Sequence, residues 1–175
     1  SMFLERFFPP SPAKIAGRRL YDSAAKQARS PNLYAVMGAP DTLDGRFELY
    51  SLHVALVVAR LRGQGETAAE VSQATFDAYV RGLDDALREI GVGDLSVGKK
   101  MKKLAAAFYG RLKGLDDVIA ALPDRAPLQA LVERTVAPAD GGAALSAYLL
   151  KVREHLAAQD TDALLGGAVS WPEAA

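Results

Sequence analysis

The stretch of sequence that decides the fold is LYSLHVALVVARL, residues 49–61. Apolar side chains occupy nearly every face of the helix that these residues would form, which predicts a central and deeply buried helix. The run contains His53 and Arg60, and it is too short to cross a bilayer by itself. Elsewhere we find no alternation of polar and apolar residues joined by hairpin turns. The sequence therefore predicts an all-α protein.

Capping and breaking residues divide the rest of the chain into further helices. Ser11-Pro12 supplies a capping hydroxyl and a first-turn proline, and Asp41 or Thr42 caps the central helix. The spacing of a capping box over 67–70 opens the next helix, which Gly91 ends. We predict a single-domain bundle of about six to seven helices over residues 12–166, with an amino-terminal extension over 1–11 and a flexible tail over 167–175.

The composition limits the chemistry that the chain can offer. Among its 175 residues there is no cysteine, and His53 and His155 are the only histidines. These absences exclude thiol nucleophiles, iron–sulfur clusters and cysteine-rich zinc sites. We therefore predict no catalytic residue, no metal site and no cofactor, and we expect a protein that is not an enzyme. Lys plus Arg and Asp plus Glu both total 21, so no overall charge draws the molecule toward DNA.

The neutral total hides two neighbouring helices of opposite charge. Residues 64–94 hold seven acids and two bases, whereas residues 95–115 hold six bases and no acid. One interpretation is that the basic face pairs with the acidic helix and keeps the bundle soluble. The other is an anion-binding face for RNA, lipid headgroups or an acidic partner. The candidate partner-binding residues are Lys99, Lys100, Lys102, Lys103, Tyr109, Arg111 and Lys113.

Two glycines interrupt segments that otherwise favour helix. Gly45 lies in the first turns of the central helix, within DTLDGRFE at 41–48, and Gly110 lies within FYGR at 108–111. A glycine inside a helix costs roughly 1 kcal/mol relative to alanine. We therefore expect a neighbouring helix to pass closely over each of them.

The acidic residues around this first glycine allow two interpretations. In the first, Asp41 and Asp44 lie at the positive end of the helix dipole, and Arg46 pairs with an acid of the 64–94 segment. In the second, the two aspartates form a catalytic pair and act with His53 in a small hydrolase. We favour the first, because no nucleophile or oxyanion donor can be named for the second.

Three segments resemble the ubiquinol-cytochrome c chaperone family. They are DTLDGRFE at 41–48 with the following Leu52-His53, LREIGVGDLSVGKKMKK at 87–103, and FYGR at 108–111. The segments occur in the family's order, and the resemblance covers roughly residues 20–120. The structural residues that it marks are Asp41, Thr42, Asp44, Gly45, Arg46, Asp84, Arg88, Glu89, Gly91, Asp94 and Gly110.

The resemblance implies a function in the assembly of respiratory complex III. Mitochondrial members of the family are all-helical assembly factors that act with a small second protein, contact the ribosome near its exit tunnel and hold newly made cytochrome b. The chain is thus expected to be a non-enzymatic assembly chaperone for the cytochrome bc1 complex. Its expected partners are nascent or unassembled cytochrome b, a small second assembly factor, and the ribosome or an anionic membrane surface. The alternative is an RNA- or ribosome-binding module that uses the basic helix over 99–113.

The amino end of the sequence bears on the compartment. Residues 2–10 lack a basic stretch followed by a small-residue cleavage site, so we expect no secretory signal. No mitochondrial presequence precedes the segments that resemble the family. The sequence therefore favours a bacterial member of the family, located in the cytoplasm and peripheral at the inner face of the cytoplasmic membrane.

Overall fold

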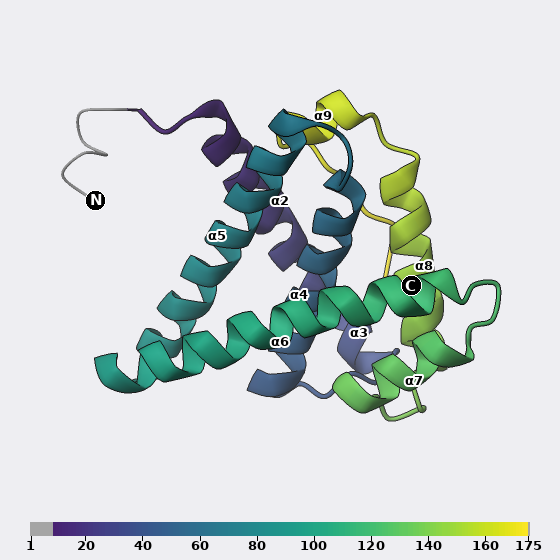
Figure 1. The fold of residues 1–175 in the computed structure, drawn as a ribbon. Coiled ribbons are helices and arrows are strands. Elements are labelled where there is room, and N and C mark those ends of the chain that lie inside the picture. The colour runs from purple at the N-terminus through teal and green to yellow at the C-terminus, as the bar shows by residue number, and fades with distance from the viewer. Residues whose placement is uncertain (1–8, 175) are drawn as a thin grey trace.

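The computed structural model describes residues 9–174, and within them the fold is entirely helical (Figure 1). This confirms the all-α prediction. Residues 1–8 of the predicted amino-terminal extension lie outside the described part. A short helix of five residues, α3, begins at Pro31. The helices are α2 (Pro12–Ala28), α3 (Pro31–Ala35), α4 (Leu43–Leu61), α5 (Glu66–Glu89), α6 (Asp94–Ala120), α7 (Ala126–Thr135), α8 (Ala143–Ala157) and α9 (Thr161–Leu165).

The central helix α4 is the core of the bundle, as its composition predicts. Leu49, Leu52 and Val54 are fully buried, and helices α2, α5, α6 and α8 all pack against α4. The Thr42 hydroxyl accepts a hydrogen bond from the Gly45 N–H at 3.1 Å, so Thr42 is the amino-terminal cap. One continuous apolar cluster joins side chains from all these helices.

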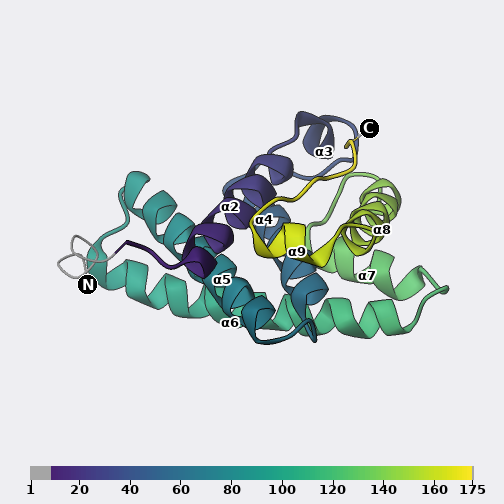
Figure 2. The ribbon, with the colours of Figure 1, turned by 90° about the horizontal axis from the view of Figure 1, so that it is seen from above.

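Helices α5 and α6 form a V-shaped hairpin whose elbow projects from the rest of the bundle in both views (Figure 1, Figure 2). Gly91 turns the chain there at φ 87°, and the Val92 N–H donates to the Leu87 carbonyl oxygen at 3.1 Å. The predicted end of this helix is thus confirmed. Its predicted start is wrong, because α5 begins directly after Gly65, one residue before Thr67 of the expected capping box.

The close contacts expected at two glycines differ from the prediction. A Cβ on Gly45 would lie 2.1 Å from the Pro40 carbonyl oxygen, so the approach comes from the loop before α4 and not from a helix. Around Gly110 nothing lies within 4 Å of such a Cβ, and the expected crossing is wrong. The tight crossing lies between α2 and α5, where a Cβ on Gly17 would be 2.4 Å from the Ala74 Cβ.

The carboxy-terminal residues lie against α2. The Trp171 indole N–H donates to Ser23 Oγ at 2.9 Å, and the Gln27 side-chain amide donates to the Pro172 carbonyl oxygen at 2.8 Å. A half-buried tryptophan adds apolar contact area to these bonds. The segment predicted as a flexible tail over 167–175 is therefore docked as far as the structure describes it.

Candidate functional site

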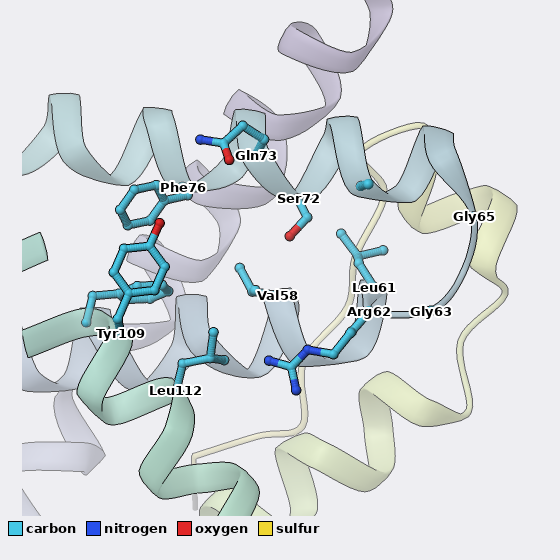
Figure 3. Close-up of a pocket in the computed structure, with 12 residues that line it drawn as sticks. Val58, Leu61, Arg62, Gly63, Gly65, Ser72, Gln73, Phe76, Tyr109 and Leu112 are labelled. Carbon is cyan, nitrogen blue, oxygen red and sulfur yellow. The ribbon is translucent and has the colours of Figure 1, made fainter. Parts of the chain in front are cut away.

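An open groove lies between the two arms of the hairpin and the carboxyl end of α4 (Figure 3). Its cavity measures about 280 Å³. Phe76 reaches toward it from α5, Leu112 from α6, and Val58 from α4. The groove is thus apolar at its centre, with polar side chains at its edge. Its lining side chains are Val58, Leu61, Arg62, Ala69, Ser72, Gln73, Phe76, Phe108, Tyr109 and Leu112.

Aromatic rings in tilted contact connect this groove to the core. The ring centroids of Phe76 and Phe108 are 5.0 Å apart, and those of Phe76 and Tyr109 are 5.4 Å apart. Behind them, Tyr79 lies 5.2 Å from Phe108, and burial raises the pKa of its phenol to about 12. The Tyr79 hydroxyl is hydrogen-bonded to Ser51 on α4. Because each ring packs on the next, the groove has a wall that is continuous with the buried core.

A bidentate ion pair beside this wall joins α4 to α6. The Arg111 guanidinium donates from Nε to Glu48 Oε2 at 2.8 Å and from Nη2 to Oε1 at 2.7 Å. These hydrogen bonds raise the pKa of Arg111 above its ordinary value. Both side chains are partly buried, which strengthens a bidentate pair relative to a surface one. Arg111, predicted to bind a partner, is therefore occupied within the protein.

A second charged cluster fixes the elbow of the hairpin. The Arg88 Nε donates to Asp84 Oδ2 at 3.0 Å on the same helix, and its Nη1 donates to Asp94 at the start of α6. One guanidinium thus spans both arms next to the turn. Glu89, also marked by the family resemblance, is exposed. The structure therefore brings together Asp84, Arg88 and Asp94 of the predicted structural residues.

The lysines of the predicted basic face all point into solvent. Lys99, Lys100, Lys102, Lys103 and Lys113 are exposed, and none of them takes part in the ion pairs found among residues 9–174. No described ion pair joins one of these lysines to the acidic helix, which was one of the two interpretations of this face. The structure thus leaves a row of cations available on α6.

The residues considered for a hydrolase are not brought together. Asp41 accepts a hydrogen bond from Arg46 Nε at 2.8 Å on the exposed surface, so the predicted pairing of Arg46 with the 64–94 segment is wrong. His53 is fully buried in α4, with Nε2 2.8 Å from the Tyr148 hydroxyl, and burial lowers its pKa to about 4. Asp44 is exposed at the start of α4. No group of three His, Cys, Asp or Glu side chains that could hold a metal ion occurs within 9–174.

Most residues of the groove escaped the sequence analysis. Phe76 and Leu112 have the helical spacing of core-facing residues, and the sequence around Ser72 and Gln73 carries no signal of a groove. The groove exists because the hairpin arms diverge from the elbow, an angle that no local sequence pattern encodes. Tyr109 alone was predicted to bind a partner, and it lies at the groove's edge with 56% of its surface exposed.

Comparisons with known proteins give the family. Residues 35–171 match the family model described as Ubiquinol-cytochrome C chaperone, and this match covers most of the chain. The chain belongs to the ubiquinol-cytochrome c chaperone family. The resemblance noted in three short segments is thereby confirmed over a longer region.

Several members of the ubiquinol-cytochrome c chaperone family are similar to this one. The chain is 23% identical over 164 residues to ubiquinol-cytochrome-c reductase complex assembly factor 1 of Xenopus laevis, a match covering 90% of this chain and 81% of that protein. The factors of Mus musculus and Homo sapiens are each 26% identical over 164 residues, which cover 55% and 54% of their lengths. The chain thus spans about half the length of these two mammalian relatives.

A solved structure has the same fold as this chain. The crystal structure of the Cbp3 homolog from Brucella abortus superposes with a TM-score of 0.82 at 32% sequence identity. The superposition covers 93% of this chain and 92% of that one. Within residues 9–174 of the present chain, no helix is long and apolar enough to cross a bilayer.

Proposed function

We propose that this protein is a non-enzymatic assembly chaperone for the cytochrome bc1 complex and that it holds an apolar segment of newly made cytochrome b. Three relatives are named as assembly factors of the ubiquinol-cytochrome c reductase complex, which supports the process. The observation that carries the binding role is the open apolar groove between the hairpin arms.

The groove suits an apolar helical segment better than a small substrate. A volume of about 280 Å³ accommodates one or two bulky side chains, so most of a bound helix lies outside it. Phe76 and Leu112 offer apolar contact, while Ser72 and Gln73 at the edge offer hydrogen bonds to polar positions of the client. Burial of one Leu or Phe side chain contributes about 1.5–3 kcal/mol, which gives reversible binding. A chaperone that must release its client requires this reversibility.

The charged surface next to the groove gives the client one orientation. Lys113 is exposed and lies one helical turn after Tyr109, which is at the edge of the groove. Acidic groups of the client or of a small second assembly factor are the complementary partners of this lysine. We place the protein at the cytoplasmic face of the membrane, where such a segment is accessible.

Deletion and complementation test this proposal. Deleting the gene in the source organism depletes cytochrome b and complex III and leaves the other respiratory complexes at normal levels. Wild-type protein and the control Ala106→Trp, on the exposed face of α6, restore complex III. Ala69→Trp fills the groove from α5 and does not restore it.

Two results contradict the proposal. Normal cytochrome b in the deletion strain excludes a function in complex III assembly. Full complementation by Ala69→Trp, with the variant folded and present at wild-type levels, excludes the groove as the client site. Crosslinking of cytochrome b to a photoreactive residue at Gln73, and not at position 106, is the direct measurement of contact.

A further inference from the structure

The elbow of the hairpin carries two large apolar side chains that the bundle does not cover. Leu95 is 91% exposed and Ile90 is 56% exposed, on either side of the turn at Gly91. We name residues 90–95 the hairpin tip. The tip projects from the body of the molecule in both views (Figure 1, Figure 2), in agreement with the exposure of both side chains. An apolar side chain so placed is suited to an external apolar phase.

Cations lie on the same face of α6 as Leu95. Lys99, Lys102 and Lys103 follow it at spacings of four, seven and eight residues, which an α-helix places on one side. Lys100 adds a fourth cation within the same two turns, and all four lysines are exposed. The face therefore consists of an apolar end followed directly by concentrated positive charge.

No described ion pair joins the nearby acids to these lysines. Asp84 and Asp94, the acids on either side of the turn, are both bound to Arg88. Asp85 and Glu89 belong to α5, and no described ion pair joins either of them to a lysine of α6. Residues 95–103 thus present four positive charges and no negative one.

We propose that the hairpin tip docks on an anionic phospholipid bilayer, with Leu95 and Ile90 in the interfacial layer and the four lysines on the headgroups. A bilayer offers both components that the tip requires, an apolar phase and a negatively charged surface above it. RNA offers negative charge only, and its stacked bases do not accept an aliphatic side chain that precedes the cations. The order along α6, apolar residue first and lysines next, favours the bilayer.

The groove lies at a distance from the hairpin tip along the same helix. Tyr109, at the groove's edge, is 14 residues beyond Leu95, which corresponds to about 21 Å along a helix that rises 1.5 Å per residue. The tip and the groove are thus separate surfaces on one rigid helix. The inference holds whichever client the groove binds, so it can fail independently of the proposed function.

Vesicle binding by the purified full chain tests the proposal. Wild-type protein floats with vesicles of phosphatidylglycerol and phosphatidylcholine and does not float with phosphatidylcholine alone. Each lysine near an anionic surface contributes about five-fold to the partition coefficient, the equivalent of about 1 kcal/mol. Neutralising Lys99 and Lys102 with glutamine therefore weakens binding roughly 30-fold. Leu95→Ser weakens it about ten-fold or more, because the buried leucine contribution is lost.

Two controls separate the tip from general charge and apolarity. Val36→Ser removes an apolar side chain that is 63% exposed at the end of α3, and Lys14→Gln with Lys26→Gln removes two exposed cations of α2. Both controls keep wild-type binding. Because the chain has no cysteine, Ser96→Cys can carry a polarity-sensitive dye beside Leu95. The dye emission shifts to shorter wavelength on anionic vesicles, whereas the same dye on Ala158→Cys does not respond.

Three results overturn the proposal. The first is an absence of binding to anionic vesicles at low salt. The second is unchanged binding by Leu95→Ser together with an unresponsive dye at position 96, which reduces the surface to simple charge attraction. The third is a short RNA that displaces the wild-type protein from vesicles. If the Leu95→Ser variant binds this RNA normally and the lysine variant does not, the face is assigned to RNA.

Discussion

The buried histidine His53 predicts that the protein loses stability in mildly acidic solution. Its Nδ1 lies 2.7 Å from the Leu49 carbonyl oxygen, which can only accept, so Nδ1 carries the proton. The other nitrogen, Nε2, then accepts from the Tyr148 hydroxyl, whose oxygen accepts from the Gln27 amide at 2.9 Å. Every polar atom in this chain of bonds is satisfied with neutral His53. A second proton on the ring would face the hydroxyl donor in a fully buried site.

The magnitude follows from the shift in pKa. Burial lowers the pKa of His53 from 6.5 to about 4 in the folded protein. Between these values the unfolded chain binds more protons than the folded one, so the contribution is complete above pH 6.5 and is lost as the pH falls toward 4. The free energy of unfolding should decrease by about 2 kcal/mol between pH 7 and pH 5 from this group alone.

Chemical denaturation at a series of pH values measures this loss. His53→Gln removes the titrating group, so its free energy of unfolding should fall by about 2 kcal/mol less than that of the wild type between pH 7 and pH 5. His155→Gln, at the other histidine, is the matched control and should keep the wild-type loss. Equal losses in wild type and His53→Gln, or an NMR titration of His53 near pH 6.5, would refute the reasoning.

Three further changes test the packing around the site. Arg111→Met leaves the half-buried Glu48 carboxylate without its bidentate partner and should lower the free energy of unfolding by roughly 2 kcal/mol. The double change with Glu48→Met should recover part of that loss in a double-mutant cycle. Trp171→Ala removes the indole that docks the carboxy-terminal segment and should lower the free energy of unfolding by roughly 2 kcal/mol. Backbone amides near residue 171 should then exchange their hydrogens faster. Unchanged exchange at these amides contradicts the docking. Gly45→Ala places a Cβ 2.1 Å from the preceding loop and should lower the thermal midpoint by an amount equivalent to about 1–3 kcal/mol, whereas Gly110→Ala should be neutral or stabilising.

The helices could be predicted from the sequence because the signals for capping, helix ends and burial lie within a few residues of one another. The Thr42 cap, the end of α5 at Gly91 and the burial of α4 follow from side chains a few residues apart. The crossing of α2 and α5 at Gly17 and Ala74 was not predictable, because it depends on residues far apart in the sequence. An isolated glycine shows that close approach is tolerated and does not show which element approaches.

The site was predictable in its parts and not in its arrangement. The exposed lysines follow from the helical spacing of the basic residues. The groove does not, because Phe76 and Leu112 have the spacing of core residues and become groove walls only where the hairpin arms separate. Arg111 lies in a basic segment, so the sequence suggested a free cation. Its carboxylate partner, Glu48, lies on another helix and could not be predicted from local spacing.

The position of Trp171 determines when this molecule can finish folding as it is synthesised. Its indole is bonded to Ser23, so the first complete helix of the described chain waits for a residue near the other end before its surface is closed. A nascent chain that has not yet released residue 171 keeps the α2 side of the bundle uncovered. This face of the bundle therefore closes only after the segment around residue 171 has left the ribosome and reached α2.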